Sequence, residues 1–172
     1  MKIRLSGIQP ESIVDGPGLR YVIFVQGCPH HCKACHNPST HCFSGGTLRD
    51  TRELVDEIFA NPLLRGVTFS GGEPFEQARA LSEIAGEIRA FRSSERCKGK
   101  RSLDIWCYTG YEYEELAASK DPYKRALLAL SDVLVDGKFV LEKKSMEKPF
   151  VGSANQRVID LASSSPGKVF QL

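Results

Sequence analysis

The chain lacks any long apolar stretch. None of its apolar runs approaches the about 20 residues that a membrane-spanning helix needs. Its first residues carry Lys2 and Arg4 instead of the apolar segment of a secretory signal peptide. We therefore expect a cytoplasmic protein, in a compartment where thiols stay reduced. The six cysteines are accordingly predicted to be metal ligands or free thiols rather than a disulfide framework.

The chain also lacks a strong excess of charge and any internal repeat. Its formal net charge is +2 over 172 residues, which indicates neither a nucleic-acid partner nor a membrane partner. Its apolar and charged fractions, 41% and 26%, are ordinary for a globular protein. This length suits one domain with a sizeable core. We expect a single domain over residues 1–172 that ends in a loose tail at residues 163–172.

Short strands alternate with amphipathic helices along the chain. The predicted strands are apolar runs at residues 21–25, 66–70, 103–108, 133–135 and 157–161. The predicted helices span residues 51–60, 81–91 and 113–130, the last with a break near Asp121 and Pro122. This alternation predicts an α/β fold with a mainly parallel sheet. A complete eight-fold barrel needs about 250 residues, so we expect a partial (β/α) barrel.

Cys28, Cys32 and Cys35 stand at a spacing of Cys-x3-Cys-x2-Cys with no fourth cysteine at matching spacing. A structural zinc site closes its coordination with four protein ligands, and a cubane iron–sulfur cluster has four irons to ligate. If three cysteines hold such a cluster, one iron stays open to an outside ligand. An open iron indicates chemistry rather than scaffolding.

Nearby side chains leave a zinc alternative open. A zinc-binding interaction module would complete its site with a further residue of the same loop: Cys42, His36 or His41. All four histidines of the chain, including His30 and His31, lie in this segment. Their clustering favours metal binding without naming the metal. The expected metal loop spans residues 27–42.

Other chemistry-bearing segments also follow predicted strands. They are Gly71-Gly72-Glu73, Thr109-Gly110 and Asp136-Gly137. Because the carboxyl ends of parallel strands meet at one edge of a sheet, we expect these segments to converge with the cysteine loop. Paired glycines let the backbone approach a ligand closely, and Glu73 is predicted to accept from a ligand ammonium. The plain alternatives are a tight turn with a surface Glu73, and an Asp136 that caps a turn.

One set of motifs resembles the radical S-adenosylmethionine enzymes: Cys28-x3-Cys32-x2-Cys35, His36-Asn37 and Gly71-Gly72-Glu73-Pro74. Residues 14–20, which read as a β-turn, are similar to the signature of the glycyl-radical activating branch. The chain most resembles the activating proteins of anaerobic ribonucleoside-triphosphate reductases. Residues 133–137 and 152–157 best separate this group from its relatives.

The resemblance implies a radical-SAM type of fold and two cofactors. Cys28, Cys32 and Cys35 would ligate three irons of a 4Fe-4S cluster. S-adenosylmethionine would chelate the open iron through its amino and carboxylate groups. The residues implied to lie against the cofactor are Ala34, Cys35, His36, Asn37, Gly71, Gly72, Glu73, Thr109 and Asp136.

The resemblance also implies an activity and partners. Reductive cleavage of S-adenosylmethionine would generate a glycyl radical on the reductase, with electrons from an external donor such as flavodoxin or ferredoxin. The nearest alternative is the activation of another glycyl-radical enzyme, of the formate-lyase type. No role is assigned to Cys42, Cys97 or the basic loop at residues 92–101, and Cys107 is predicted to be a small buried hydrophobe.

Overall fold

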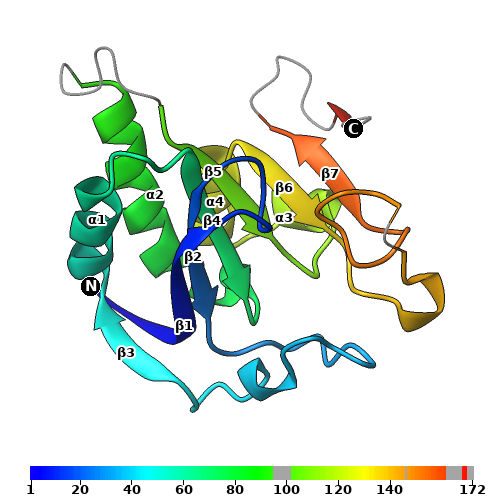
Figure 1. Ribbon diagram of the computed structural model, residues 1–172. Coiled ribbons are helices and arrows are strands. Elements are labelled where there is room, and N and C mark those ends of the chain that lie inside the picture. The colour runs from blue at the N-terminus through cyan, green and yellow to red at the C-terminus, as the bar shows by residue number, and fades with distance from the viewer. Residues whose placement is uncertain (95–101, 146, 162–167, 170–172) are drawn as a thin grey trace.

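The computed structural model describes residues 1–94, 102–145, 147–161 and 168–169. Its centre is a set of four parallel strands, β2 (Arg20–Val25), β4 (Gly66–Gly71), β5 (Asp104–Tyr108) and β6 (Val133–Asp136). Antiparallel strands flank them: β1 (Lys2–Ser12), β3 (Thr47–Asp50), β7 (Arg157–Asp160) and β8 (Lys168–Val169). Together they form one eight-stranded sheet in the order β3-β1-β2-β4-β5-β6-β7-β8 (Figure 1).

The predicted α/β fold and the parallel arrangement of its central strands are confirmed. The sheet is mixed and does not close into a barrel. Strands β1, β3 and β8 were not predicted. In β1, buried Ile3 and Leu5 alternate with more exposed neighbours, but register irregularities follow Leu5 and Gln9, so the alternation is short.

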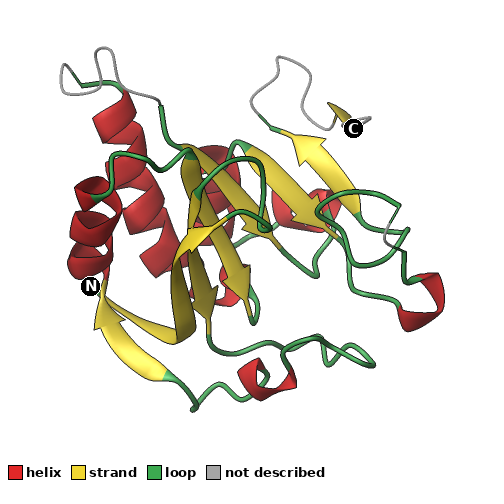
Figure 2. Cartoon of the chain, in the orientation of Figure 1, coloured by secondary structure: helices red, strands yellow, loops and turns green. Residues whose placement is uncertain are grey.

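In the described part of the chain, α-helices connect the parallel strands (Figure 2). They are α1 (Thr51–Ala60), α2 (Ala78–Arg92), α3 (Tyr113–Ala117) and α4 (Pro122–Leu130). Short 3-10 turns occupy Pro38–Thr40, Pro74–Gln77 and Leu141–Lys143. The predicted helix break is confirmed, because Asp121 starts a new helix by accepting a hydrogen bond from the Tyr123 amide at 2.8 Å, with Pro122 in the first turn.

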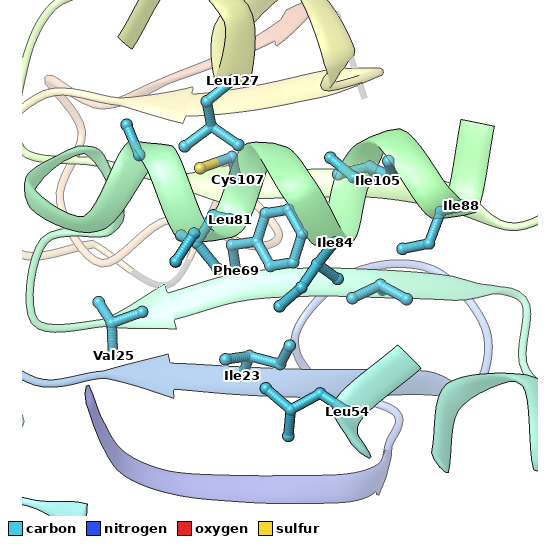
Figure 3. Packing of buried hydrophobic residues seen from close by; sticks show 14 of the residues in the cluster. Ile23, Val25, Leu54, Phe69, Leu81, Ile84, Ile88, Ile105, Cys107 and Leu127 are labelled. Atoms are coloured by element: carbon cyan, nitrogen blue, oxygen red, sulfur yellow. The ribbon is translucent and has the colours of Figure 1, made fainter. Parts of the chain in front are cut away.

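The main core lies between the sheet and helices α1, α2 and α4. Figure 3 shows Ile23 and Phe69 of the sheet against Leu81 and Ile84 of α2, and all four side chains are fully buried. Burying one such side chain contributes about 1.5–3 kcal/mol. Cys107 of β5 belongs to the same core, as predicted, and burial raises the pKa of its thiol well above the ordinary value.

A smaller apolar cluster occupies the opposite face of the sheet, where Trp106 packs with Val133, Val135 and Val158. The guanidinium of Arg20 lies 5.4 Å from the centre of the Trp106 ring and pairs with Asp104 at 2.6 Å. Its side chain is fully buried. Arg20 Nη1 also donates to the Pro17 carbonyl at 3.2 Å, and the Thr68 hydroxyl donates to the Asp15 carbonyl at 2.8 Å, so the turn at residues 14–19 is fixed against the sheet.

Several features predicted from the sequence fall partly outside the described residues. In the basic segment, Arg92 ends α2 and pairs with Asp132 at 2.8 Å, whereas residues 95–101, with Cys97, lie outside the described ranges. Residues 163–167 and 170–172 of the expected tail do so as well, whereas Lys168–Val169 form β8 and pair with β7 instead of being loose. No helix in the described ranges combines the length and the apolar character needed to span a membrane.

Candidate functional site

The cysteine loop follows directly from β2 and folds back on itself. The Gly27 amide donates to the Thr40 carbonyl at 2.8 Å, and the Cys28 amide donates to the His41 carbonyl at 3.2 Å. Between these ends, the Cys35 amide donates to the Cys32 carbonyl at 3.2 Å. The backbone thus holds the loop in a compact form below the carboxyl ends of β2 and β4 (Figure 1).

The end of β4 is bonded to the start of this loop. The Gly72 amide donates to the Val25 carbonyl, and the Glu73 amide donates to the Gly27 carbonyl, both at 2.8 Å. A Cβ atom at residue 72 would lie 2.4 Å from the Gly27 oxygen, so a side chain there would force the two segments apart. Gly71 has a φ of +100°, which also favours glycine. Close approach of backbone explains why two glycines stand at this position.

A pocket of about 260 Å³ opens at this edge of the sheet. The segments that line it follow β2, β4, β5 and β6, and the predicted convergence is therefore confirmed. The predicted site residues among its lining are Cys28, Cys32, Cys35, His36, Asn37, Gly71, Gly72 and Thr109. That these residues hold a cofactor remains a prediction.

Glu73 lies behind the pocket wall rather than in it. Its side chain is fully buried, and its Oε1 atom accepts from the Phe75 amide at 3.0 Å and from the Thr109 hydroxyl at 2.9 Å. Its Oε2 atom accepts from the Gly110 amide at 2.9 Å and contacts His30 Nε2 at 2.8 Å. Protein groups therefore surround the carboxylate in this structure, and that it accepts from a ligand ammonium stays a prediction.

Two further predicted residues also lie outside the pocket lining. The carboxylate of Asp136 is buried and is held by the Tyr113 amide at 2.8 Å and by Nε of Arg157 at 2.9 Å. Asp136 lines a neighbouring recess instead, together with its charge partner Arg157 of β7. Ala34 is exposed and has a φ of +57°, so it forms part of the turn between Cys32 and Cys35.

The pocket also contains residues that the sequence did not identify. They include Phe139 and Phe150. His30, His41 and Gln156 also line the pocket, and the sequence had singled out the histidines only for metal binding and Gln156 only within residues 152–157. Gln156 accepts from the Gly152 amide and donates to the Gly137 carbonyl, at 2.8 and 2.9 Å, and so ties the segment before β7 to the end of β6. The segment at residues 152–157 had been singled out only by resemblance, and nothing in its composition showed that it returns to the cysteine loop.

The thiols of the loop differ in their surroundings. Burial raises the pKa of Cys28, so a metal would have to displace its proton. Cys42 is exposed, does not line the pocket and contacts the Ser44 hydroxyl, which lowers its pKa. The described residues contain no group of three His, Cys, Asp or Glu side chains arranged to hold a single metal ion. Cys28, Cys32 and Cys35 instead share the wall of one pocket.

Comparisons with known proteins cover this whole region. Residues 14–159 match the family model described as a 4Fe-4S single cluster domain. An anaerobic ribonucleoside-triphosphate reductase-activating protein of Vibrio cholerae is 41% identical over 152 residues, which are 86% of this chain and 91% of the relative. The chain belongs to the family of anaerobic ribonucleoside-triphosphate reductase-activating proteins.

More distant members of the same reductase-activating family align over a similar span. The activating protein of Escherichia coli K12 is 36% identical over 155 residues, covering 87% of this chain and 93% of its own length. That of Enterobacteria phage T4 is 33% identical over 157 residues, covering 88% and 90%. The matched 4Fe-4S domain includes every residue that lines the pocket.

Proposed function

We propose that this chain activates an anaerobic ribonucleoside-triphosphate reductase by reductive cleavage of S-adenosylmethionine at a 4Fe-4S cluster. The observation that carries the proposal is the shared pocket, in which Cys28, Cys32 and Cys35 face Gly71 and Gly72 from the neighbouring strand end. The proposal is also supported by similar proteins, which are named anaerobic ribonucleoside-triphosphate reductase-activating proteins. The family description of a 4Fe-4S domain favours a cluster over the zinc alternative.

In this proposal the three cysteines each hold one iron. The fourth iron would be left without a protein ligand, and S-adenosylmethionine would bind there through its amino and carboxylate groups. The donor set fits such a cluster, because thiolates are its usual ligands. The glycine wall fits the cofactor, because Gly71 and Gly72 place backbone at the pocket surface without a side chain in the way.

The cluster, when bound, would supply the electron that breaks a carbon–sulfur bond of S-adenosylmethionine, so that a 5′-deoxyadenosyl radical takes a hydrogen atom from a glycine of the reductase. The residues of this chain would bind the two cofactors and orient them relative to each other. Thr109, Gly110 and Gly137 line the same pocket as the cysteines, and Phe139 and Phe150 add aromatic side chains to its lining. Holding the reacting groups in a fixed orientation supplies part of the rate.

The finer features expected from the sequence belong to the same proposal. The mixed sheet is taken as a partial (β/α) barrel of the radical-SAM type, in a single domain over residues 1–172 with its cluster loop at residues 27–42. Ala34, Glu73 and Asp136 remain cofactor-binding residues in this proposal, at the loop turn, the pocket wall and the β6 end. An external electron donor such as flavodoxin or ferredoxin would act in the cytoplasm.

The test is electron paramagnetic resonance of the anaerobically reconstituted protein mixed with the reductase, a reductant and S-adenosylmethionine. We expect a reduced-cluster signal, formation of 5′-deoxyadenosine and a glycyl radical signal on the reductase. Zinc without iron or sulfide in anaerobically purified protein would overturn the cluster assignment. Cofactor cleavage with a radical only on a formate-lyase-type partner would overturn the choice of reductase.

A further inference from the structure

A buried side-chain contact ties the cysteine loop to the pocket wall. His30 lies between Cys28 and Cys32, and its Nε2 atom is 2.8 Å from Oε2 of Glu73. Only 6% of the His30 side chain and none of the Glu73 side chain are exposed. A carboxylate can only accept at neutral pH, so Nε2 must carry the hydrogen of this bond.

The surroundings of His30 leave its ring little freedom. The ring packs edge-on against Tyr111, with the ring centres 4.6 Å apart. A Cβ atom added to Gly110 would lie 2.3 Å from the imidazole, so the backbone of the segment after β5 also packs closely against the ring. The imidazole is therefore held between the two segments that form the wall behind the pocket.

Glu73 is the point where three parts of the site meet. Its carboxylate accepts from Phe75 after β4, from Thr109 and Gly110 after β5, and from His30 in the cysteine loop. The bonds from Phe75, Thr109 and Gly110 lie within the wall, where they link the segment after β4 to the segment after β5. Of these four bonds, the one from His30 joins the wall to the cysteine loop.

We propose that His30 is a positioning residue that sets the distance between the cluster loop and the glycine wall through its hydrogen bond to Glu73. This inference rests on the proposed function. S-adenosylmethionine would have to span from the open iron, which the loop carries, to Gly71 and Gly72, which the wall carries. A shift of about 1 Å between two such groups can cost about a hundredfold in rate.

The test compares two amide side chains that differ by one methylene. In His30→Gln the amide nitrogen reaches the place of Nε2 and can donate to Glu73, whereas in His30→Asn it stops short. The control is Lys33→Gln in the same loop, whose side chain is 79% exposed and does not line the pocket. Each protein is reconstituted, and its iron and sulfide content is measured first.

We expect His30→Asn to bind iron and sulfide as the wild type does, but to raise the KM for S-adenosylmethionine about tenfold or more. The change that S-adenosylmethionine causes in the paramagnetic resonance spectrum of the reduced cluster should weaken in parallel. His30→Gln should recover most of both, and Lys33→Gln should match the wild type. A wild-type KM in His30→Asn, or a defect in His30→Gln as large as that in His30→Asn, would overturn the proposal.

A measurement on the metal-free protein separates this inference from the proposed function. Backbone amides of residues 27–35 should exchange hydrogen faster in His30→Asn than in the wild type or in His30→Gln. Equal exchange in all three proteins would overturn the tether. If the loaded wild type fails to cleave S-adenosylmethionine, the proposed function fails, and the exchange rates still decide whether His30 holds the loop.

Discussion

The carboxylate of Glu73 shows how a buried charge can organise a site without facing it. Such a group is costly to bury unless hydrogen bonds replace its water. Here two backbone amides, one hydroxyl and one imidazole do so. The four bonds come from three segments of the chain. The same bonds that stabilise the buried carboxylate therefore also hold together the segments that shape the pocket.

Replacing Glu73 by Gln should destabilise the fold. The amide nitrogen of glutamine is itself a donor and would face groups that now donate to the carboxylate. Leaving such buried groups unpaired costs about 1–3 kcal/mol each. The measurement is urea unfolding of the metal-free protein. Its control is Glu142→Gln at an exposed carboxylate 3.8 Å from Lys33, where the change should be under about 1 kcal/mol. Equal stability of Glu73→Gln and wild type would show that the four bonds carry little weight.

The cysteines offer a second matched comparison at the residue scale. Cys32 lines the pocket, whereas Cys42 in the same loop is exposed and does not. We expect Cys32→Ser to lose 5′-deoxyadenosine formation and most of its iron, and Cys42→Ser to keep both. Iron analysis and product chromatography measure the two quantities. Loss of activity in both variants, or in neither, would contradict the assignment of ligands.

At the scale of single elements, the start of α4 is defined by Asp121. Its side chain accepts from the Tyr123 amide at 2.8 Å, and Pro122 follows in the first turn. Asp121→Ala should lower the free energy of unfolding by about 1 kcal/mol, because one amide of the helix start loses its partner. Thermal unfolding measures the effect. Asp121→Asn, which keeps an acceptor oxygen, should retain most of the stability, and an equal loss in both variants would argue against capping.

Elements with a strong pattern could be predicted from the sequence, and the flanking strands could not. Continuous apolar runs identified β2, β4, β5 and β6, because strands covered on both faces contain few polar residues. Strand β3 is only four residues long, and none of them is buried. Its position depends on pairing with β1, in which Ile3 lies opposite Arg49. Such pairing is a property of two segments, which no local pattern contains.

At the scale of the whole molecule, ionised carboxylates link elements across the surface. Glu76 accepts from Lys124 of α4 and from the Tyr111 hydroxyl, both at 2.7 Å. Burial acts to raise the pKa of Glu76, but the hydrogen bonds from Lys124 and Tyr111 outweigh it, and the pKa lies below its ordinary value of 4.5. The unfolded chain thus takes up this proton first as the pH falls.

This linkage predicts a pH dependence of stability. The contribution of ionised Glu76 is present above about pH 4.5 and is lost as the pH falls through the lower pKa of the folded state. The difference in unfolding free energy between wild type and Glu76→Gln should therefore shrink as the pH falls below about 4.5. Urea unfolding at a series of pH values measures it. A difference that stays constant over this range would contradict the linkage.

The candidate site was predictable in position and only partly in detail. Residues that follow parallel strands had to meet at one edge, and Cys28, Gly72 and Thr109 do so. The orientation of the carboxylates was not predictable, because it depends on donors far along the chain. Asp136 turns towards Arg157 of β7 and away from the pocket, and the sequence around Asp136 gives no indication of that partner.

The hydrogen bonds between the cysteine loop and the end of β4 also set an order of events during biosynthesis. Cys28 leaves the ribosome well before Gly72 and Glu73, whose amides bond to Val25 and Gly27. Until β4 has been made and has paired with β2, the thiols have no wall to face and remain open to oxidation or to the wrong metal. A cell that makes this chain is best served by delivering iron and sulfide after translation, to a domain that has already folded.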